Sequence, residues 1–428
     1  MRKQLRYLSI VLAFAAAVMP LGQTAFSKGP SKSVSESASE PIRTFALGPG
    51  IDNLSLGDAY AIYQWGLKND GEFRLTQLQQ AFQSVGDQLG STPTEAKSGQ
   101  VGIPRVVGPG AYESVVTSAV PGVDINILPA WDLYNAAENK RQVIVAVIDT
   151  GIDYTHPELA NALWFNQGEI PGDGIDNDGN GYIDDIYGWD FYYNNNRTFV
   201  GTEDSHGTHA AGTIGANKGS SGIVGITDNH YVKIMSLKAL GGYYGSGSVE
   251  AVVEAIHYAE TMGASICNLS FGTDIYDARL EAAIANSSML FIIAAGNGDS
   301  AGKGYSTDES PIYPASFTSG NIISVANLLF DGSLSESSNY GVTSVDIAAP
   351  GSYVLSTVPG NQYGFMTGTS MAAPMVTGVA AMLYSYRPGL SLQEVRQILL
   401  NSARKMDGLS GKLSTGGMLD AYAALSYQ

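Results

Sequence analysis

The sequence predicts an α/β fold in three layers, with a mostly parallel central sheet covered by helices on both faces. The first observation is a set of short, continuously apolar runs, as expected for strands that are buried on both faces. The second is that these runs alternate with helix-like stretches from about residue 130 onward, which is typical of parallel sheets. The strand-like runs are 143–149, 232–237, 265–271, 289–295 and 321–327.

Helix-like stretches lie between and around these strands. Residues 71–89 place apolar side chains at helical spacing. Ser391 and Glu394 are spaced as a capping box, so a late surface helix is expected to begin there. The helix-like stretches are 71–89, 248–263, 278–287 and 391–405.

The first 57 residues are interpreted as targeting and linking segments. Three basic residues precede an apolar stretch over 7–21, which is short for a membrane span and typical of a secretory signal peptide. We therefore expect a signal peptide at 1–27, followed by a leader, linker or short propeptide at 28–57. No later segment is long and apolar enough to span a bilayer, and the C-terminus has no anchor pattern. The sequence thus predicts a secreted, extracellular protein.

Charge and cysteine content narrow the possible functions. The 428-residue chain carries a net charge of −17 and a single cysteine, Cys267. Phosphate binding needs a basic surface, so nucleic acid is not an expected partner. Dense acid favours a bound cation, although it can also serve solubility alone. Cys267 lies in an apolar run without a neighbouring charge, which favours a buried, inert thiol over a nucleophile.

Three short segments carry the residue types of nucleophilic catalysis. Asp149 ends the run at 143–149, at the sheet edge where open α/β folds bind ligands. His206 stands in SHGTHAAGT, and Ser370 begins a helix-like segment whose N–H groups would face a developing oxyanion. A serine hydroxyl needs a histidine to take its proton, and the histidine needs a carboxylate to fix its tautomer. Two alternatives stay open: a metal site at His206 and His209, and an inactive binding module.

The segments DTGIDYTHPEL, HGTHAAGT and GTSMAAPMVTG closely resemble the signature boxes of the subtilases, the subtilisin-like serine proteases. The resemblance covers about 130–428 and implies the subtilisin-like fold and endopeptidase activity through an acyl-enzyme. By position, Asp149 is the orienting acid, His206 the general base and Ser370 the nucleophile. His209 takes the place of a structural histidine. Asn297, in FIIAAGNG, takes the place of the oxyanion-hole asparagine, whose loss costs roughly 10²–10³ in rate.

The resemblance also implies where a protein or peptide substrate would bind. Segments 236–242 and 268–272 are similar to the two that flank an extended peptide backbone. Residues 294–297 are similar to one wall of the pocket for the side chain before the cut. The implied substrate-binding residues are Leu240, Gly241, Gly242, Ser270, Phe271, Gly272, Ala295, Gly296 and Ile312. The enzyme is expected to act as a monomer.

Ile312 falls where subtilisin carries a glycine at the floor of that pocket. An isoleucine there implies a shallower pocket, which favours small or medium apolar side chains. Asp299, Asp308 and Glu309 are close in sequence, so a preference for basic residues stays open.

Residues 173–190 read DGIDNDGNGYIDDIYGWD and predict a structural Ca²⁺ loop. Asp176, Asp178 and Asn180 follow the start of an EF-hand loop, but the twelfth position is Tyr187 where an EF-hand needs Glu. We therefore expect a shorter calcium loop, because so many acids would repel one another unless neutralised. The expected ligands are Asp173, Asp176, Asp178, Asn180, Tyr182 and Asp184, with Asp185 as a possible addition to the set.

The resemblance implies two further calcium ligands, Asp58 and Glu158. Asp58 precedes YQWGL, and Glu158 stands where the family carries a ligating aspartate. At the companion loop, Gly219 stands where subtilisin has an asparagine ligand.

The domain boundaries follow from the same resemblance. Residues 62–69, IYQWGLKN, look like the start of a mature subtilase, so 58–428 is interpreted as the peptidase domain with an insertion at 71–120. The alternative makes 28–120 a propeptide that is cleaved near Val120.

Overall fold

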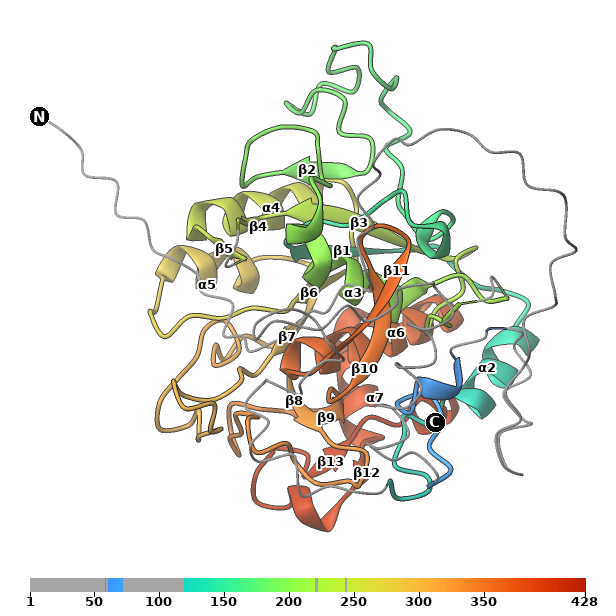
Figure 1. The fold of residues 1–428 in the computed structure, drawn as a ribbon, viewed down its shortest axis with the longest axis vertical. Coiled ribbons are helices and arrows are strands. Elements are labelled where there is room, and N and C mark those ends of the chain that lie inside the picture. The colour runs from blue at the N-terminus through green and yellow to red at the C-terminus, as the bar shows by residue number, and fades with distance from the viewer. Residues whose placement is uncertain (1–57, 59–60, 72–118, 220–221, 243–244) are drawn as a thin grey trace, which may run out of the picture.

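The computed structural model of the chain describes residues 58, 61–71, 119–219, 222–242 and 245–428 (Figure 1). The expected signal peptide, the leader up to residue 57 and the expected helix at 71–89 lie outside the described residues, apart from Gly71. Within the described part of the chain, no helix is long and apolar enough to cross a membrane.

Nine strands of the described chain form the central sheet, in the order β12-β13-β9-β8-β7-β6-β1-β3-β2. Neighbouring strands are parallel except β12 and β13, which are antiparallel. The strands are β1 (Val143–Asp149), β2 (Gly188–Asp190), β3 (Val232–Lys238), β6 (Ile266–Leu269), β7 (Leu290–Ala294), β8 (Ile322–Leu328), β9 (Ile347–Pro350), β12 (Arg404–Lys405) and β13 (Gly417–Met418). Two hairpins lie outside this sheet: β4 (Leu240–Gly241) with β5 (Ser246–Gly247), and β10 (Val354–Val358) with β11 (Gln362–Met366).

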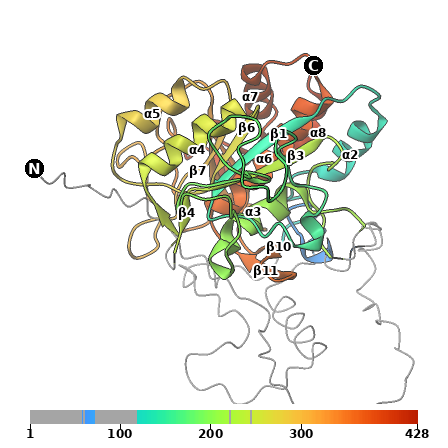
Figure 2. The ribbon, with the colours of Figure 1, turned by 90° about the horizontal axis from the view of Figure 1, so that it is seen from above.

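Helices cover both faces of the sheet, and Figure 2 shows α4 and α5 on one side of the strands and α2 and α8 on the other. One face packs against α4 (Val249–Thr261) and α5 (Ala278–Ala285). The other packs against α2 (Ile127–Ala136), α3 (Ser205–Gly215), α6 (Thr369–Tyr386), α7 (Leu392–Asn401) and α8 (Ala421–Ser426). Short 3₁₀ turns occur at η1 (Ala61–Tyr63), η3 (Pro157–Leu159), η4 (Thr202–Asp204) and η5 (Asp407–Leu409).

Strand β1 illustrates why the apolar runs are continuous. Val145 and Val147 pack into the core on the α3 and α6 side, whereas Ala146 and Ile148 pack into the core on the α4 and α5 side. Because successive side chains of a strand point to opposite faces, a strand covered on both sides needs apolar residues at every position. The predicted α/β sheet with helices on both faces is confirmed.

The segment at 61–71 packs into the folded body. Trp65 is 1% exposed, donates from its indole nitrogen to the Ser352 carbonyl and stacks edge-on against Phe330. Gln64 exchanges two hydrogen bonds with the backbone of Val224. Removal of this segment would leave a cavity and unpaired polar groups, both of which destabilise a fold.

Candidate active site

Asp149 and His206 come from different elements and meet at the carboxyl end of β1. Nδ1 of His206, in the first turn of α3, lies 2.8 Å from Oδ1 and 2.9 Å from Oδ2 of Asp149. A carboxylate only accepts hydrogen bonds, so Nδ1 carries the proton and Nε2 is the basic nitrogen of the neutral ring. Asp149 is fully buried, and its Oδ1 also accepts from the Thr150 N–H. The arrangement gives His206 one fixed tautomer.

Ser370 is the second residue of α6, and its side chain is buried at the positive end of that helix. Its hydroxyl donates to the Ser270 carbonyl at 3.0 Å. Pro374 lies four residues further along α6 and has no N–H to donate to the Ser370 carbonyl. The Ser270 hydroxyl donates to that carbonyl instead, at 3.1 Å. Ser270 and Ser370 are thus joined by two reciprocal hydrogen bonds.

Asn297 lies in the loop after β7 with its amide held by α6. Its Oδ1 accepts from the backbone N–H of Thr369 at 2.8 Å and from the Thr369 hydroxyl at 3.0 Å. Because a backbone N–H can only donate, this contact fixes which amide atom is oxygen and makes Nδ2 the donor. Nδ2 lies 3.1 Å from a Cβ placed on Gly368, two residues before Ser370. The orientation fits a donor to a negative oxygen that forms next to Ser370.

His209 lies one turn after His206 but has other partners. It is fully buried, and its Nε2 donates to the carbonyls of Val354 and Gly364 in the β10–β11 hairpin. Burial lowers the pKa of His209 to about 3, so the ring is neutral at pH 7. The two histidines therefore bond in different directions, which disfavours the alternative of a shared metal ion.

The expected substrate segments lie beside this site. Leu240 and Gly241 are buried and form β4, which pairs with β5, whereas Ser246 and Gly247 in β5 are partly exposed. The edge that an added strand could reach therefore belongs to β5, which the sequence did not single out. Gly242 follows β4 in the left-handed region, with φ at 69°.

The other expected pocket residues would face a substrate mainly with their backbone atoms, because their side chains are buried or absent. The Phe271 side chain packs in the core under α4 and α5, and Ala295 packs in the core around Trp65. Gly296 has a φ of 100°, and its carbonyl accepts from the Asn339 N–H. Their side chains therefore do not form the walls of an open pocket.

Ile312 fills the space between two of these backbone segments. A Cβ placed on Gly272 would lie 2.7 Å from Cγ2 of Ile312, and one on Gly296 would lie 3.8 Å from the same methyl. Ile312 is 8% exposed. Of the nearby acids, Asp308 accepts hydrogen bonds from the 342–344 loop, and Asp299 accepts from the N–H groups of Ala301 and Lys303. These two acids are therefore already engaged by backbone N–H groups.

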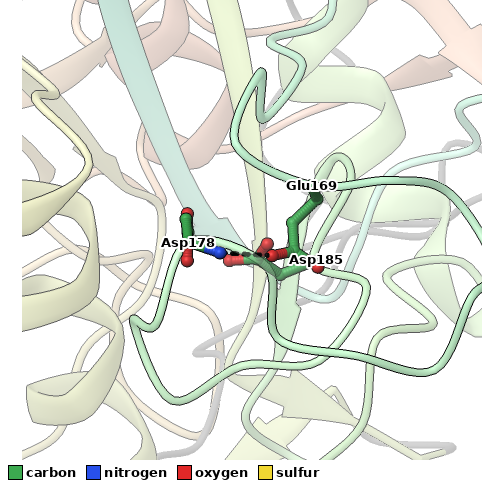
Figure 3. A group of neighbouring side chains, drawn as sticks. All are labelled: Glu169, Asp178 and Asp185. Carbon is green, nitrogen blue, oxygen red and sulfur yellow. Dashed lines mark hydrogen bonds between the residues drawn. The ribbon is translucent and has the colours of Figure 1, made fainter.

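Among the described residues, one carboxylate cluster could hold a metal ion, and it consists of Glu169, Asp178 and Asp185 (Figure 3). One oxygen of each lies within 4.8 Å of the others. Glu169 and Asp185 are buried, and the set offers the oxygen donors that Ca²⁺ prefers. Of the expected ligands, Asp178 belongs to this cluster, as does Asp185, the expected addition to the set, whereas Glu169 was not predicted.

The other expected ligands lie in the same loop, and most of them accept hydrogen bonds from its N–H groups. Asp176 accepts from the N–H groups of Gly179, Asn180 and Gly181, Asp184 from those of Gly172 and Gly174, and Asp173 from that of Ile175. Asn180 donates to Asp178 and Asp185, and the Tyr182 ring packs against Trp189. These groups therefore shape the loop around the three-acid cluster.

Asp58 and Glu158 each accept a hydrogen bond from the chain just after α3, at Gly219 and Asn217 respectively. Asp58 accepts from the Gly219 N–H at 2.8 Å, and Glu158 accepts from the Tyr363 hydroxyl at 2.7 Å. Neither belongs to the described three-acid cluster.

Comparison with known proteins decides the family. The model of the Subtilase family matches residues 140–418. Thermitase of Thermoactinomyces vulgaris is 33% identical over 302 residues, which cover 70% of this chain and 92% of thermitase. The chain belongs to the subtilase family. The thermophilic serine proteinase of Bacillus sp. (strain AK1) is 35% identical, over 70% of this chain and 64% of its own length.

Structural similarity agrees with this subtilase assignment. A crystal structure of a cold adapted subtilisin-like serine proteinase matches with a TM-score of 0.52 and 27% identity, over 67% of this chain and 91% of that chain. The major intracellular serine protease of Bacillus subtilis (strain 168) is 34% identical, over 61% of this chain and 74% of its own length. The subtilase described here spans 64% and 49% of two of its curated relatives, the AK1 proteinase and Subtilisin-like protease 1 of Plasmodium vivax. Family and fold, predicted from the three motifs, are confirmed.

Proposed function

We propose that this subtilase is a serine endopeptidase with Asp149, His206 and Ser370 as its triad and Asn297 in its oxyanion hole. The observation that carries the proposal is the contact between His206 Nδ1 and the Asp149 carboxylate at 2.8 Å. It is supported by the packing of α3, which carries His206, against α6, which begins with Thr369 and Ser370. The His206–Asp149 contact leaves Nε2 as the base, and the helix N-terminus lies where negative charge would form.

The proposed reaction has two halves. His206 Nε2 takes the Ser370 proton as Oγ attacks the peptide carbonyl, and Asn297 Nδ2 donates to the resulting oxyanion. The imidazolium then gives its proton to the leaving amine, and water hydrolyses the acyl-enzyme by the same route. Before attack, the Ser370 hydroxyl must leave the Ser270 carbonyl. A substrate N–H that binds this carbonyl would release the hydroxyl.

The substrate is proposed to be an extended protein or peptide segment. Its backbone would pair with the exposed edge of β5 and with 270–272, as in other cases of strand addition. Ile312 would limit the residue before the cut to small or medium apolar side chains, because its methyl occupies the space between Gly272 and Gly296.

We further propose that a structural Ca²⁺ ion is held by Glu169, Asp178 and Asp185. Bound there, the ion would offset the repulsion among three close carboxylates and fix the 166–185 loop. It would take no part in peptide hydrolysis. Calcium at Asp58 and Glu158 remains a secondary proposal based on the family resemblance.

The proposal extends to the export of the protein and to the N-terminus of the mature enzyme. The protein would be secreted after removal of residues 1–27 and act as a monomer. Because 61–71 is packed into the body, we favour an insertion at 71–120 over a propeptide at 28–120. N-terminal sequencing of the mature enzyme tests this: a start near residue 28–58 fits the insertion, and a start near 120 fits the propeptide.

The activity is tested with casein in calcium buffer, beside a Ser370→Ala variant with the same melting temperature. We expect only the wild type to cut casein, with small or medium apolar residues before the cuts. A folded, calcium-loaded and fully processed wild type that leaves casein intact would refute the proposed activity.

A further inference from the structure

Lys238 is a fully buried cation next to the catalytic residues, with no part in the reaction described above. It ends β3 and pairs in register with Asp149 of β1 on one side and with Asp190 of β2 on the other. In-register neighbours on parallel strands point to the same face, about 5 Å apart. The sheet therefore places one lysine between two buried aspartates.

The Lys238 ammonium group makes three hydrogen bonds, and they join two elements. It donates to Asp204 Oδ1 at 2.7 Å, to Glu203 Oε1 at 2.8 Å and to the Thr150 carbonyl. Thr150 directly follows Asp149 at the end of β1, and Asp204 directly precedes α3, two residues before His206. Lys238 is thus bonded both to the chain that carries the acid and to the chain that carries the base.

The second oxygen of Asp204 extends this connection. Asp204 Oδ2 accepts from the N–H groups of Val200 and Gly201, so the buried carboxylate is bonded at both oxygens. Buried carboxylates of this kind are stable only when paired. Without Lys238, Asp204 and Glu203 would face Asp149 and Asp190 with no cation between them.

The rest of the α3 interface leaves little space. The Gly207 N–H donates to the Thr150 hydroxyl at 3.0 Å, and a Cβ on Gly207 would lie 2.3 Å from the Gly151 carbonyl oxygen. A small tilt of α3 would therefore break these contacts and move His206 away from Asp149. Gly207 allows α3 to lie this close to the end of β1, and Lys238 holds the two together through its bonds to Asp204 and Thr150.

We propose that Lys238 is a positioning residue, which holds the start of α3 against the end of β1 so that His206 keeps its hydrogen bond to Asp149. It acts through Asp204 and Thr150 and does not touch the substrate. The inference rests on the proposed peptidase function, but the His206–Asp149 contact that it concerns can be measured without any turnover.

The test compares Lys238→Met, which removes the charge at similar volume, with Lys238→Arg, which keeps it. Lys233→Met is the matched control, because Lys233 lies near the other end of the same strand and donates to the Asn161 carbonyl. We expect Lys238→Met to lower kcat roughly 10²-fold with little change in KM, since a displacement of about 1 Å is worth that much. Lys238→Arg should recover part of the loss, and Lys233→Met should match the wild type.

The second readout is the downfield proton resonance of His206 Nδ1–H, which reports the hydrogen bond to Asp149 directly. We expect it to shift or vanish in Lys238→Met and to persist in Lys233→Met. A folded Lys238→Met variant with wild-type kcat and an unchanged resonance would overturn the proposal. If the wild type has no peptidase activity, the proposed function fails, while the resonance still decides the role of Lys238.

If Lys238→Met does not fold, Glu203→Gln tests the same proposal with a smaller perturbation. Glu203 is partly exposed, and its replacement keeps Lys238 and Asp204 while weakening one ion pair. We expect a smaller loss in kcat at constant KM and a shifted resonance. Wild-type values for both would equally overturn the proposal.

Discussion

His206 Nδ1 lies 2.8 Å from Asp149 Oδ1, although the two residues are 57 positions apart in the sequence. The contact exists because β1 ends at Asp149 where α3 begins, and because the glycines at this junction allow a close approach. Everything proposed for the chemistry depends on this one geometry.

Asp149→Asn should lower kcat by roughly 10⁴-fold, the loss known for this change in serine proteases, because an amide favours the wrong tautomer of the histidine. KM should change little, since Asp149 is buried beneath the site. Steady-state kinetics on a peptide substrate measure both values. A loss of less than tenfold in a folded variant would mean that Asp149 does not orient the base.

Asn297→Ala should lower kcat by roughly 10²–10³-fold through loss of the donor to the oxyanion. The same change leaves the Thr369 N–H without its acceptor, so a small drop in melting temperature is also expected. Asn286→Ala, at an exposed position, is the matched control. Equal kcat values for the two variants would remove Asn297 from the mechanism.

Ile312→Ala should widen substrate choice toward larger side chains before the cut. Truncation removes the methyl that lies between Gly272 and Gly296. In a peptide series, kcat/KM for Phe relative to Ala should rise roughly 10-fold or more, the scale of one or two methylenes in an apolar pocket. Ile170→Ala, which is 60% exposed, should leave the ratio unchanged. An unchanged ratio in Ile312→Ala would place the pocket elsewhere.

Asp190 should make stability fall as pH rises from about 4 to about 6. Burial raises the pKa of Asp190 to about 6, and its Oδ2 has no hydrogen-bond partner within the described chain. The folded state then holds this proton more tightly than the unfolded state, so the free energy of unfolding falls when Asp190 ionises. The cost is on the order of 2–3 kcal/mol above pH 6.

Urea unfolding of Asp190→Asn in a Ser370→Ala background tests this. The gain in stability over the parent should be larger at pH 8 than at pH 4 by that amount. The exposed Asp132→Asn should show no such pH dependence. A gain for Asp190→Asn that is equal at both pH values would contradict the raised pKa.

Calcium should stabilise the folded protein, and a chelator should lower its melting temperature. At a calcium concentration 100 times Kd the expected gain is about 2.7 kcal/mol. Glu169→Gln should reduce the calcium-dependent shift, whereas Asp173→Asn should retain it in full, because Asp173 lies outside the three-acid cluster. The reverse pattern in calorimetry would favour the ligand set expected from the sequence.

Several of the longer elements could be predicted from the sequence, because their buried positions follow a regular order of apolar residues. Strand β7 and helix α7 are of this kind, and the capping box at Ser391 and Glu394 forms as expected. Strands β2, β12 and β13 have only two or three residues, which is too short for a recognisable local pattern. They are strands because they pair with segments that are distant in the sequence.

The residues of the candidate site also differ in how far the sequence predicts them. The motifs predict Asp149, His206 and Ser370 because each stands in a long, specific segment. The calcium ligands predicted along the loop remain a prediction, and short Asp side chains such as Asp176 also bond to the N–H groups of their own turn. Glu169 lies four residues before the predicted loop at 173–190, outside its motif, and Lys238 meets Asp204 from a different strand, so the sequence pattern signals neither of them.

The central claim is that Ser370 is a nucleophile activated by His206. Its most direct test is a fluorophosphonate probe followed by peptide mass mapping, on the wild type and on a folded His206→Ala variant. The account predicts one adduct, on Ser370, in the wild type, and labelling slowed by orders of magnitude in His206→Ala. Equal labelling of both proteins, or an adduct on a residue other than Ser370, would contradict it.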